Sequence, residues 1–522
     1  MNASRYFFYL LLTVIPAIFL SCSKGCNLAE NYVRSNDFLI WNISRFENTA
    51  KVIPPGANNK CILGKIIVCT GQTRPGEIVS RALYNSDGSI DTLSLGTSVP
   101  YPVDTSTESI ATDNQIIRLK DGSFLAMKNG YTWEEINPHP AWWNSFDYIG
   151  SSMKNGGRNS VYVWISTDCG SSWQRQGKID AAKVLSGKYG WPQPTDDDND
   201  GNQDKDANGK LIWWIGGFDR TEIYQNPWSG TIYISGHGDG GPYKSGAQTI
   251  SNHNEVIFYS TDNGKTWDVA KEIDNGAPIV MTSTPNGRFY AFSCSGGTPK
   301  LYITTTPGDP STLNNGFSVF YEDEVNGNKQ QVSAAVDQSS HILRNIQQPS
   351  ISRVSLDAST SVVRIAYSAL NSSGRQVYKI INVKVDDNNP SAAPEVTSVK
   401  TIQADDPAKF SCVFGCFIDP EFNEIPSGYQ TNKALFYWIE TSTGNDPAKI
   451  SAKYVLFHND YSMSSQPDFL SRSNGAPRYW NDKTGVGDYM SGGFFWANNE
   501  LNYFAQWVDA AGIHGNIVTV PK

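Results

Sequence analysis

The stretch that decides the fold is Ser166-Thr167-Asp168-Cys169-Gly170-Ser171-Ser172-Trp173, and it returns as Ser260-Thr261-Asp262-Asn263-Gly264-Lys265-Thr266-Trp267. Both copies read Ser-x-Asp-x-Gly-x-x-Trp, and both follow a run of β-branched and aromatic residues, which favours a strand. Aspartate and serine side chains accept hydrogen bonds from turn amides, glycine permits a positive φ, and tryptophan can wedge between neighbouring sheets. The repeat therefore predicts two hairpin turns of the same build in an all-β chain.

A unit of strand, turn, strand, loop, strand, turn, strand recurs around these motifs, and we count six units between residues 115 and 520. Repeats of this length in an all-β chain are typical of a β-propeller. A pair of β-sandwiches is the alternative, and it explains neither the motif nor the repeat. The last unit lacks an outer strand, which we expect residues 63–95 to supply and so close the ring. The predicted fold is an all-β, six-bladed β-propeller of four-stranded antiparallel blades.

The repeated motif resembles the Asp box of the sialidase superfamily, a hairpin turn found in propeller blades. In such a propeller the turns joining strands one to two and three to four share one end of the ring, which we call the turn rim. The loops joining strands two to three, and each blade to the next, share the other end, the loop rim. The resemblance implies that a glycan-binding or catalytic site lies on the loop rim, because sialidase-like proteins carry it there.

One feature departs from the family. True sialidases bind the carboxylate of sialic acid with three arginines, the first at the start of the first inner strand. The corresponding stretch here, residues 112–117, contains no arginine, and Arg118 lies further along the same strand. The hypotheses that remain open are a glycoside hydrolase, a lyase acting on uronic acids, and a non-catalytic glycan-binding or scaffold propeller. We favour an enzyme that cleaves an acidic glycan.

The loops assigned to the loop rim contain the candidate side chains. Aromatic rings stack on sugars, and histidine, tyrosine and carboxylate side chains transfer protons. Arginine pairs with a substrate carboxylate. The catalytic candidates are His139, His237, Asp239 and Tyr489, and the substrate-binding candidates are Arg220, Trp133, Trp142, Trp143, Tyr243, Gln348 and Asp488. For these residues a structural role is a comparable alternative: an aromatic cluster packing on itself, a flexible polar loop, a salt bridge of Arg220, or core packing of Tyr489.

An acidic insertion at about residues 181–214 predicts a metal site. Asp196 to Gly209 reads Asp-x-Asp-x-Asp-Gly and then Asp-x-Asp-x-Asn-Gly, and alternating carboxylates with a glycine at the turn suit calcium. It is not a standard EF-hand, because the twelfth position carries no glutamate. The candidate Ca²⁺ ligands, for a structural ion, are Asp196, Asp198, Asp200, Asp204, Asp206 and Asn208. The alternative is a solvated acidic loop.

The amino-terminal residues predict export. Arg5 precedes an apolar run from Tyr6 to Leu20, which is short for a membrane span and suits a signal peptide. Leu20-Ser21-Cys22 resembles a bacterial lipobox, which implies a signal peptide over residues 1–22, lipidation of Cys22 and a cell-surface or outer-membrane location; otherwise the chain is periplasmic or secreted. Residues 23–60 are then a tether and lead-in to a propeller over residues 61–522.

The remaining cysteines and the overall charge limit which disulfides and which binding partners we expect. Cys61 with Cys69 and Cys412 with Cys416 are disulfide candidates in an oxidising compartment, and Cys294 looks like a packing residue. The net charge of −9, without a basic run, argues against a nucleic-acid partner. We therefore expect a monomer whose partners are a glycan and, through the lipid anchor alone, a membrane.

Overall fold

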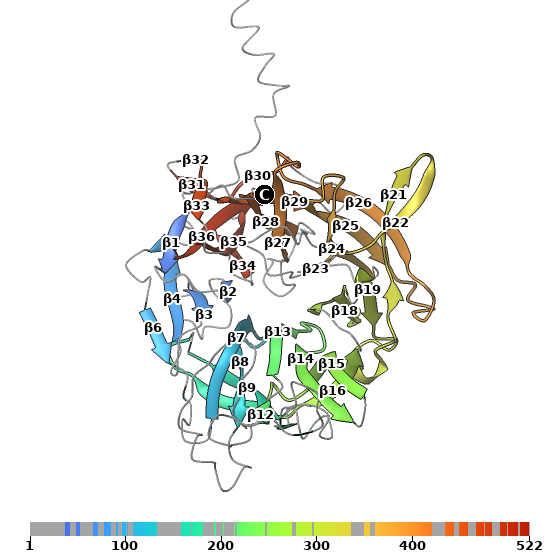
Figure 1. Cartoon of the computed structure of the whole chain (residues 1–522). Coiled ribbons are helices and arrows are strands. Elements are labelled where there is room, and N and C mark those ends of the chain that lie inside the picture. Colours follow the sequence, from blue (N-terminus) through green and yellow to red (C-terminus); the bar gives the residue numbers. More distant parts are fainter. Residues whose placement is uncertain are drawn as a thin grey trace, which may run out of the picture.

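In the computed structural model the chain is a β-propeller of antiparallel sheets arranged around a central axis (Figure 1). The structure describes residues 37–41, 49–52, 66–70, 78–84, 90–91, 97–100, 102, 108–132, 158–168, 170–180, 193–194, 202, 213–214, 217–245, 248–273, 278–294, 297–335, 349–354, 361–419, 434–442, 448–457, 466–473, 475–482, 491–497, 500–509 and 512–520. For some strand residues, among them 217–221 and 237–254, it describes the backbone alone. No helix among these residues is long and apolar enough to cross a membrane.

The six predicted blades are present, each a meander that starts with its inner strand. Blade one contains β7 (Glu108–Arg118), β8 (Phe124–Thr132), β9 (Arg158–Ser166) and β10 (Gln174–Asp180). Blade two contains β13 (Gly217–Gln225), β14 (Ile232–Ser245), β15 (Gln248–Ser260) and β16 (Asp268–Ile273). Blade three contains β17 (Val280–Ser283), β18 (Phe289–Ser293), β19 (Lys300–Ile303) and β20 (Phe317–Ser318).

The later blades repeat the same order. Blade four contains β23 (Ser350–Arg353), β24 (Val362–Leu370), β25 (Gln376–Lys384) and β26 (Glu395–Ile402). Blade five contains β27 (Phe410–Ile418), β28 (Ala434–Ser442), β29 (Ala448–Phe457) and β30 (Asp468–Phe469), with β33 (Trp480–Asp482) also pairing with β29. Blade six contains β34 (Ser491–Ala497), β35 (Glu500–Asp509) and β36 (Gly512–Val520).

The outer strand of blade six comes from a part of the chain that differs from the prediction. It is β1 (Phe38–Trp41), which pairs antiparallel with β36. The strand-like residues 63–95 instead contribute to a separate sheet of β2 (Thr49–Val52), β3 (Ile66–Thr70), β4 (Ile78–Tyr84), β5 (Ile90–Asp91) and β6 (Thr97–Pro100). Because β2 packs against β34 and β7, this sheet lies in the ring between blades six and one (Figure 1).

Short elements decorate the ring. They are the paired strands β11 (Gln193–Pro194) and β12 (Trp213–Trp214), the hairpin β21 (Tyr321–Val325) and β22 (Asn328–Val332), the pair β31 (Arg472–Ser473) and β32 (Ala476–Pro477), and a 3₁₀ turn at Pro310–Thr312. Pairing of β11 with β12 brings together the chain on either side of residues 195–212, the part of the insertion that contains the acidic run.

The core lies between successive blades. A middle strand has a neighbouring blade on each side, which is why β24 is buried from Val362 to Ala369 without alternation. Leu125 of blade one packs with Ile234 and Phe258 of blade two in one such cluster, and similar clusters follow between the next blades. Cys294 is fully buried in one of them, as expected for a packing residue.

The candidate disulfide between Cys412 and Cys416 does not form, because neither cysteine is part of a disulfide. A bulge in β27 shifts the register between Val413 and Cys416, and Phe414 within it has a φ of 52°. Cys412 consequently packs in the cluster between blades four and five, whereas Cys416 packs in the cluster between blades five and six. The sheet itself thus separates the two sulfur atoms. Cys61 lies outside the described residues.

Candidate functional site

The repeated motifs form two turns that share a core of hydrogen bonds: in each, the aspartate carboxylate accepts from the amide and the hydroxyl of the residue four positions on, and the glycine amide donates to the serine Oγ. In the second turn the Asp262 carboxylate accepts from the Thr266 amide at 2.9 Å and from the Lys265 amide at 3.0 Å, while the Gly264 amide donates to Ser260 Oγ at 2.9 Å. Gly264 has a φ of 86°, which a side chain would disfavour. Partial burial acts to raise the pKa of Asp262, but these hydrogen bonds outweigh it and lower the pKa to about 2.

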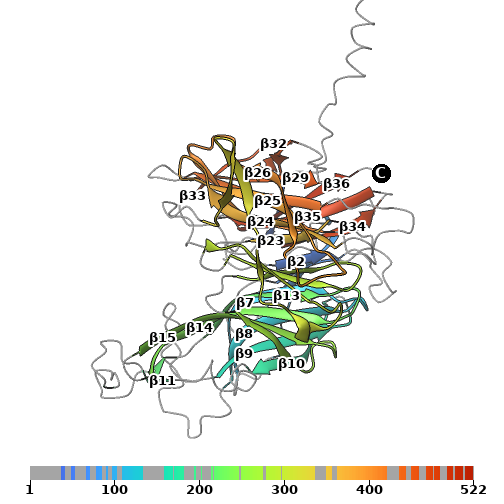
Figure 2. The same cartoon turned by 90° about the vertical axis from the view of Figure 1, so that its right-hand side faces the viewer.

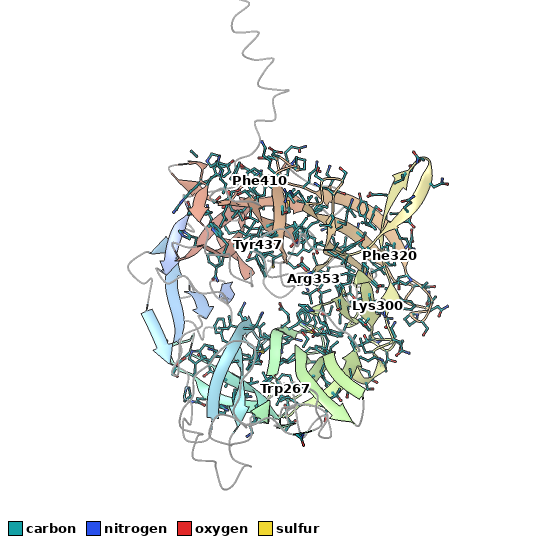
Figure 3. All side chains as sticks on the ribbon, viewed as in Figure 1. Trp267, Lys300, Phe320, Arg353, Phe410 and Tyr437 are labelled. Carbon is teal, nitrogen blue, oxygen red and sulfur yellow. The ribbon has the colours of Figure 1, made fainter. Side chains whose placement is uncertain are left out.

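The second turn also binds blade two to blade one. Trp267 is buried and packs in the cluster between these blades, with its Nε1 donating to the Gly264 carbonyl at 3.0 Å (Figure 3). Gln176 Nε2 of β10 donates to the Asn263 carbonyl at 2.9 Å. Blade three lacks the motif: at the equivalent turn Asp309 accepts from the Ser311 amide, and Gly308 retains a φ of 77°. These contacts give the turns a structural role.

A charged cluster lies on the turn rim at the inner strands. The Asp419 carboxylate, just after β27, accepts from the Arg353 amide at 3.0 Å, and Arg353 Nε lies 4.0 Å from the same oxygen. Arg353 lies on the inner side of the ring (Figure 3), with its guanidinium 5.3 Å from the Trp228 ring of blade two. Burial raises the pKa of Asp419 against the opposing effect of Arg353. Because Arg353, Asp419 and Trp228 join three blades, the cluster stabilises this end of the ring.

The loop rim of blade two carries a different arrangement, in which one row of residues crosses three strands. His237 of β14 is in register with Asp219 of β13 on one side and with Glu255 of β15 on the other. Residues in register on antiparallel strands share a face, with Cβ atoms about 5 Å apart. The register therefore brings one histidine between two carboxylic acids.

The adjacent row adds two more residues to the same face. Asp239 is in register with His253, two positions along each strand from His237 and Glu255. Tyr233 and Ser235 lie on this face too, and they identify what it faces: the Tyr233 ring stacks on Phe289 with centroids 3.7 Å apart, and Ser235 Oγ donates to the Ile279 carbonyl. The face is therefore turned toward blade three, and Glu255 is fully buried on it.

The hairpin that carries these rows is long. β14 has 14 residues and β15 has 13, and the hairpin projects past the neighbouring strands in the side view of Figure 2. Tyr243 pairs with Ile250 near its tip, after a bulge that follows Gly240. Arg220 lies in a second bulge, between Asp219 and Glu222 of β13, on the half of the strand nearest the loop rim. His237, Asp239, Arg220 and Tyr243 are thus brought to one end of one blade.

Several predicted residues lie outside the described part of the chain. These are His139, Tyr489, Trp133, Trp142, Trp143, Gln348, Asp488, the six acidic-insertion ligands and Cys22. Sequence reasoning missed Glu255, although His253 and Glu255 are separated by one residue in a strand, and that spacing places them on one face. Among residues with described side chains, no group of His, Cys, Asp or Glu forms a metal site.

Arg118 lies at the wrong end of its strand to serve a site on the loop rim. It pairs with Phe124 next to the tight turn that joins β7 to β8. The start of β7, which lies on the loop rim, contains Glu108 and Ser109 and has no arginine over residues 108–117. The half of β7 nearest the loop rim therefore offers no arginine.

Comparison with known proteins finds likeness in structure alone. No family model and no curated protein matches the sequence. Solved structures similar to this chain include a mutant NanB sialidase from Streptococcus pneumoniae, at 10% identity and a TM-score of 0.34, covering 94% of this chain and 99% of that one. A Trypanosoma rangeli sialidase matches at 9% identity and a TM-score of 0.34, over 91% of this chain and 55% of its own.

A leech intramolecular trans-sialidase is similar at 10% identity and a TM-score of 0.40, over 88% of this chain and 70% of that one. At these identities and TM-scores the likenesses carry no assignment for this chain. The assignment of the fold rests on the strand order itself, with inner strands around an axis and clusters of apolar side chains between blades.

Proposed function

We propose that this protein is an exported enzyme that cleaves an acidic glycan on the loop rim of blade two. The observation that carries the proposal is the register of His237 with Asp219 and Glu255 across three strands. An imidazole flanked by carboxylates is a group that donates and accepts protons near neutral pH. Arg220, one residue from Asp219, supplies the positive charge that would neutralise a sugar carboxylate.

The other predicted residues complete the proposal. Asp239 and Tyr243 lie on the same hairpin as His237, and Tyr243 is a candidate proton donor. The loop with His139, Trp133, Trp142 and Trp143 follows β8, whose end lies on the loop rim, and its rings would stack on sugars. We propose that Cys22 anchors the protein to a membrane surface and that the substrate is an extracellular glycan.

Turnover on a glycan panel tests the proposal. The purified full chain is incubated with sialylated oligosaccharides and uronic-acid polysaccharides; a hydrolase releases reducing ends, whereas a lyase leaves an unsaturated sugar. His237→Ala is expected to lower kcat by about 100-fold or more, as for loss of an acid–base group. His341→Ala removes a histidine to which no role is assigned and should leave kcat unchanged. If His237→Ala cleaved the glycan as fast as the unaltered protein does, the proposed site on blade two would be wrong.

A second candidate function is a non-catalytic glycan-binding or scaffold propeller. It is favoured by the absence of arginine at the start of β7 and by the position of Arg118 beside the turn rim. Binding on a glycan array, with no product from any member of the panel, would support this alternative and exclude the enzyme.

A further inference from the structure

Tyr479 is the only exposed aromatic residue among those whose side chains the structure describes. It is 51% exposed, whereas the other described phenylalanine, tyrosine and tryptophan residues are buried or half-buried. Its ring packs against Phe469 in a T-shaped pair with centroids 5.4 Å apart. An aromatic ring that is supported on one side and open to solvent on the other is a surface on which a sugar ring stacks.

The segment that carries Tyr479 is fixed to blade five on both sides. β30 and β33 both pair antiparallel with β29, and Tyr479 immediately precedes β33. Between these strands the Arg478 amide donates to the Ser471 carbonyl at 2.9 Å, and Ser471 Oγ donates to the Arg478 carbonyl at 3.0 Å. Because the backbone is already held, ordering the ring costs little of the free energy of binding a ligand.

Three charged groups lie next to the Tyr479 ring. Lys453 Nζ lies 2.6 Å from Asp405 Oδ2 and 3.3 Å from Glu440 Oε1. The same ammonium lies 4.6 Å from the centroid of the Phe469 ring, against which Tyr479 packs. Burial raises the pKa of the Tyr479 hydroxyl, and the charge of Lys453 opposes that shift. The charges of Asp405 and Glu440 act in the same direction as burial, so the hydroxyl is within electrostatic reach of all three groups.

Asp405 is the charged residue of this group that a ligand can reach. Its side chain is 70% exposed, whereas those of Lys453 and Glu440 are 2% and 6% exposed. Asp405 lies between β26 and β27, in a connection that joins one blade to the next and therefore belongs to the loop rim. Two carboxylates against one ammonium leave a net negative charge here. An exposed carboxylate accepts hydrogen bonds from sugar hydroxyls, and the same charge repels the carboxylate of an acidic sugar.

We propose that Tyr479 and Asp405 form an accessory binding site for a neutral sugar unit, which stacks on Tyr479 and donates hydroxyl hydrogen bonds to Asp405. Lys453 is a positioning residue, because it holds one oxygen of the Asp405 carboxylate in place. Blade five lies across the ring from blade two in the view of Figure 1, so this site is separate from the hairpin to which cleavage is assigned. It shares with the proposed function a glycan as ligand, and it does not depend on cleavage.

Calorimetric titration of the full chain tests the site, with cellohexaose, mannohexaose and linear galacto-oligosaccharides as neutral probes and sialyllactose as the acidic one. We expect at least one neutral probe to bind more tightly than sialyllactose. Tyr479→Ala and Asp405→Asn should each weaken that binding at least about tenfold, as loss of an aromatic anchor or of a charged acceptor does. Val325→Ala truncates another exposed apolar side chain and is the matched control, which should bind as the unaltered protein does.

Two further measurements keep the outcome decisive. Thermal unfolding of each variant shows whether a loss of binding reflects a loss of fold, and Tyr479→Phe, which retains the ring, should retain most of the affinity. His237→Ala should bind the neutral probe unchanged, so a failure of cleavage on blade two leaves this site standing. Binding of no neutral probe, or equal binding by Tyr479→Ala, would overturn the proposal. Tyr479-dependent binding of sialyllactose as tight as that of the neutral probes would overturn the assignment to a neutral sugar.

Discussion

Gly177 of blade one lies directly against Gly264 of blade two. A Cβ atom on Gly177 would come within 2.4 Å of the Gly264 carbonyl oxygen and 2.8 Å of the Lys265 carbonyl oxygen. The backbone of the second repeated turn therefore packs against blade one, as Trp267 does, and this close approach depends on a glycine in the outer strand of blade one.

Gly177→Ala should lower the free energy of unfolding by about 2 kcal/mol, as overpacking against fixed groups does. The methyl group meets backbone oxygen, which cannot rotate away. Gln176→Ala is the comparison, because it loses one exposed hydrogen bond and should cost less than about 1 kcal/mol. Urea unfolding of both variants measures the difference. If Gly177→Ala and Gln176→Ala had the same free energy of unfolding, the two blades would be able to move apart and accommodate the methyl group.

Asp262→Asn should destabilise the protein most near neutral pH. The hydrogen-bonded carboxylate has a pKa of about 2, below that of the unfolded chain, so its stabilisation is present above pH 4 and is lost as the pH falls toward 2. The stability difference between Asp262→Asn and the unaltered protein is therefore expected to narrow from pH 5 to pH 3. A difference independent of pH in thermal unfolding would contradict the hydrogen-bonded turn.

Asp37 is expected to lock β1 onto the ring. Its carboxylate accepts from the Arg472 amide at 3.1 Å and from Arg478 at 2.9 Å, with 1% of the side chain exposed. Asp37→Ala removes both of these hydrogen bonds and should cost about 2 kcal/mol. Hydrogen exchange should then rise along β36, whose edge β1 covers. Asp406→Ala, which removes an exposed ion pair with Lys409, is the control and should leave that exchange unchanged.

Asp419→Asn separates stability from function. Breaking the buried contacts of Asp419 with Ser352 and Arg353 should lower the free energy of unfolding by about 3 kcal/mol. This cluster lies on the turn rim, at the opposite end of the ring from the proposed site. Affinity for a glycan should therefore change by less than about twofold, which corresponds to under 0.5 kcal/mol. If Asp419→Asn stayed folded yet lost its affinity for the glycan, the glycan site would lie on the turn rim instead.

Calcium removal should lower the melting temperature. The predicted ligands from Asp196 to Asn208 lie between β11 and β12, and binding to the folded state alone stabilises it by mass action. EDTA is expected to lower the melting temperature, and Ca²⁺, added in excess, should restore it. Asp200→Asn together with Asp204→Asn should make the protein insensitive to both. An unchanged melting temperature in EDTA would leave the insertion as a solvated loop.

The fold was largely predictable, because the signals that specify blades are local. The Ser-x-Asp-x-Gly-x-x-Trp motif specifies its own hydrogen bonds, and runs such as Val362–Ala369 specify strands buried on both faces. Closure of the ring was not predictable. Short apolar segments between residues 38 and 100 all suit an edge strand, and the choice of Phe38–Trp41 depends on which backbone reaches β36.

The candidate site was predictable in part. His237, Asp239 and Arg220 follow from the loops that a propeller places on its loop rim. Glu255 and the register of His237 with Asp219 required the structure, because a bulge between Asp219 and Glu222 shifts β13 relative to β14. A strand pattern counted from sequence carries no sign of where such a bulge falls.

The sequence by itself determined the class of fold, the two motif turns and the residue types available for chemistry, since each depends on neighbours within about ten residues. Only the tertiary structure decided that Cys412 and Cys416 lie on opposite faces of β27 and that β1 completes blade six. It also decided that two histidines and two acids share one face of the blade-two hairpin. Those relationships depend on strand register, which is set by packing between blades and by bulges rather than by local sequence.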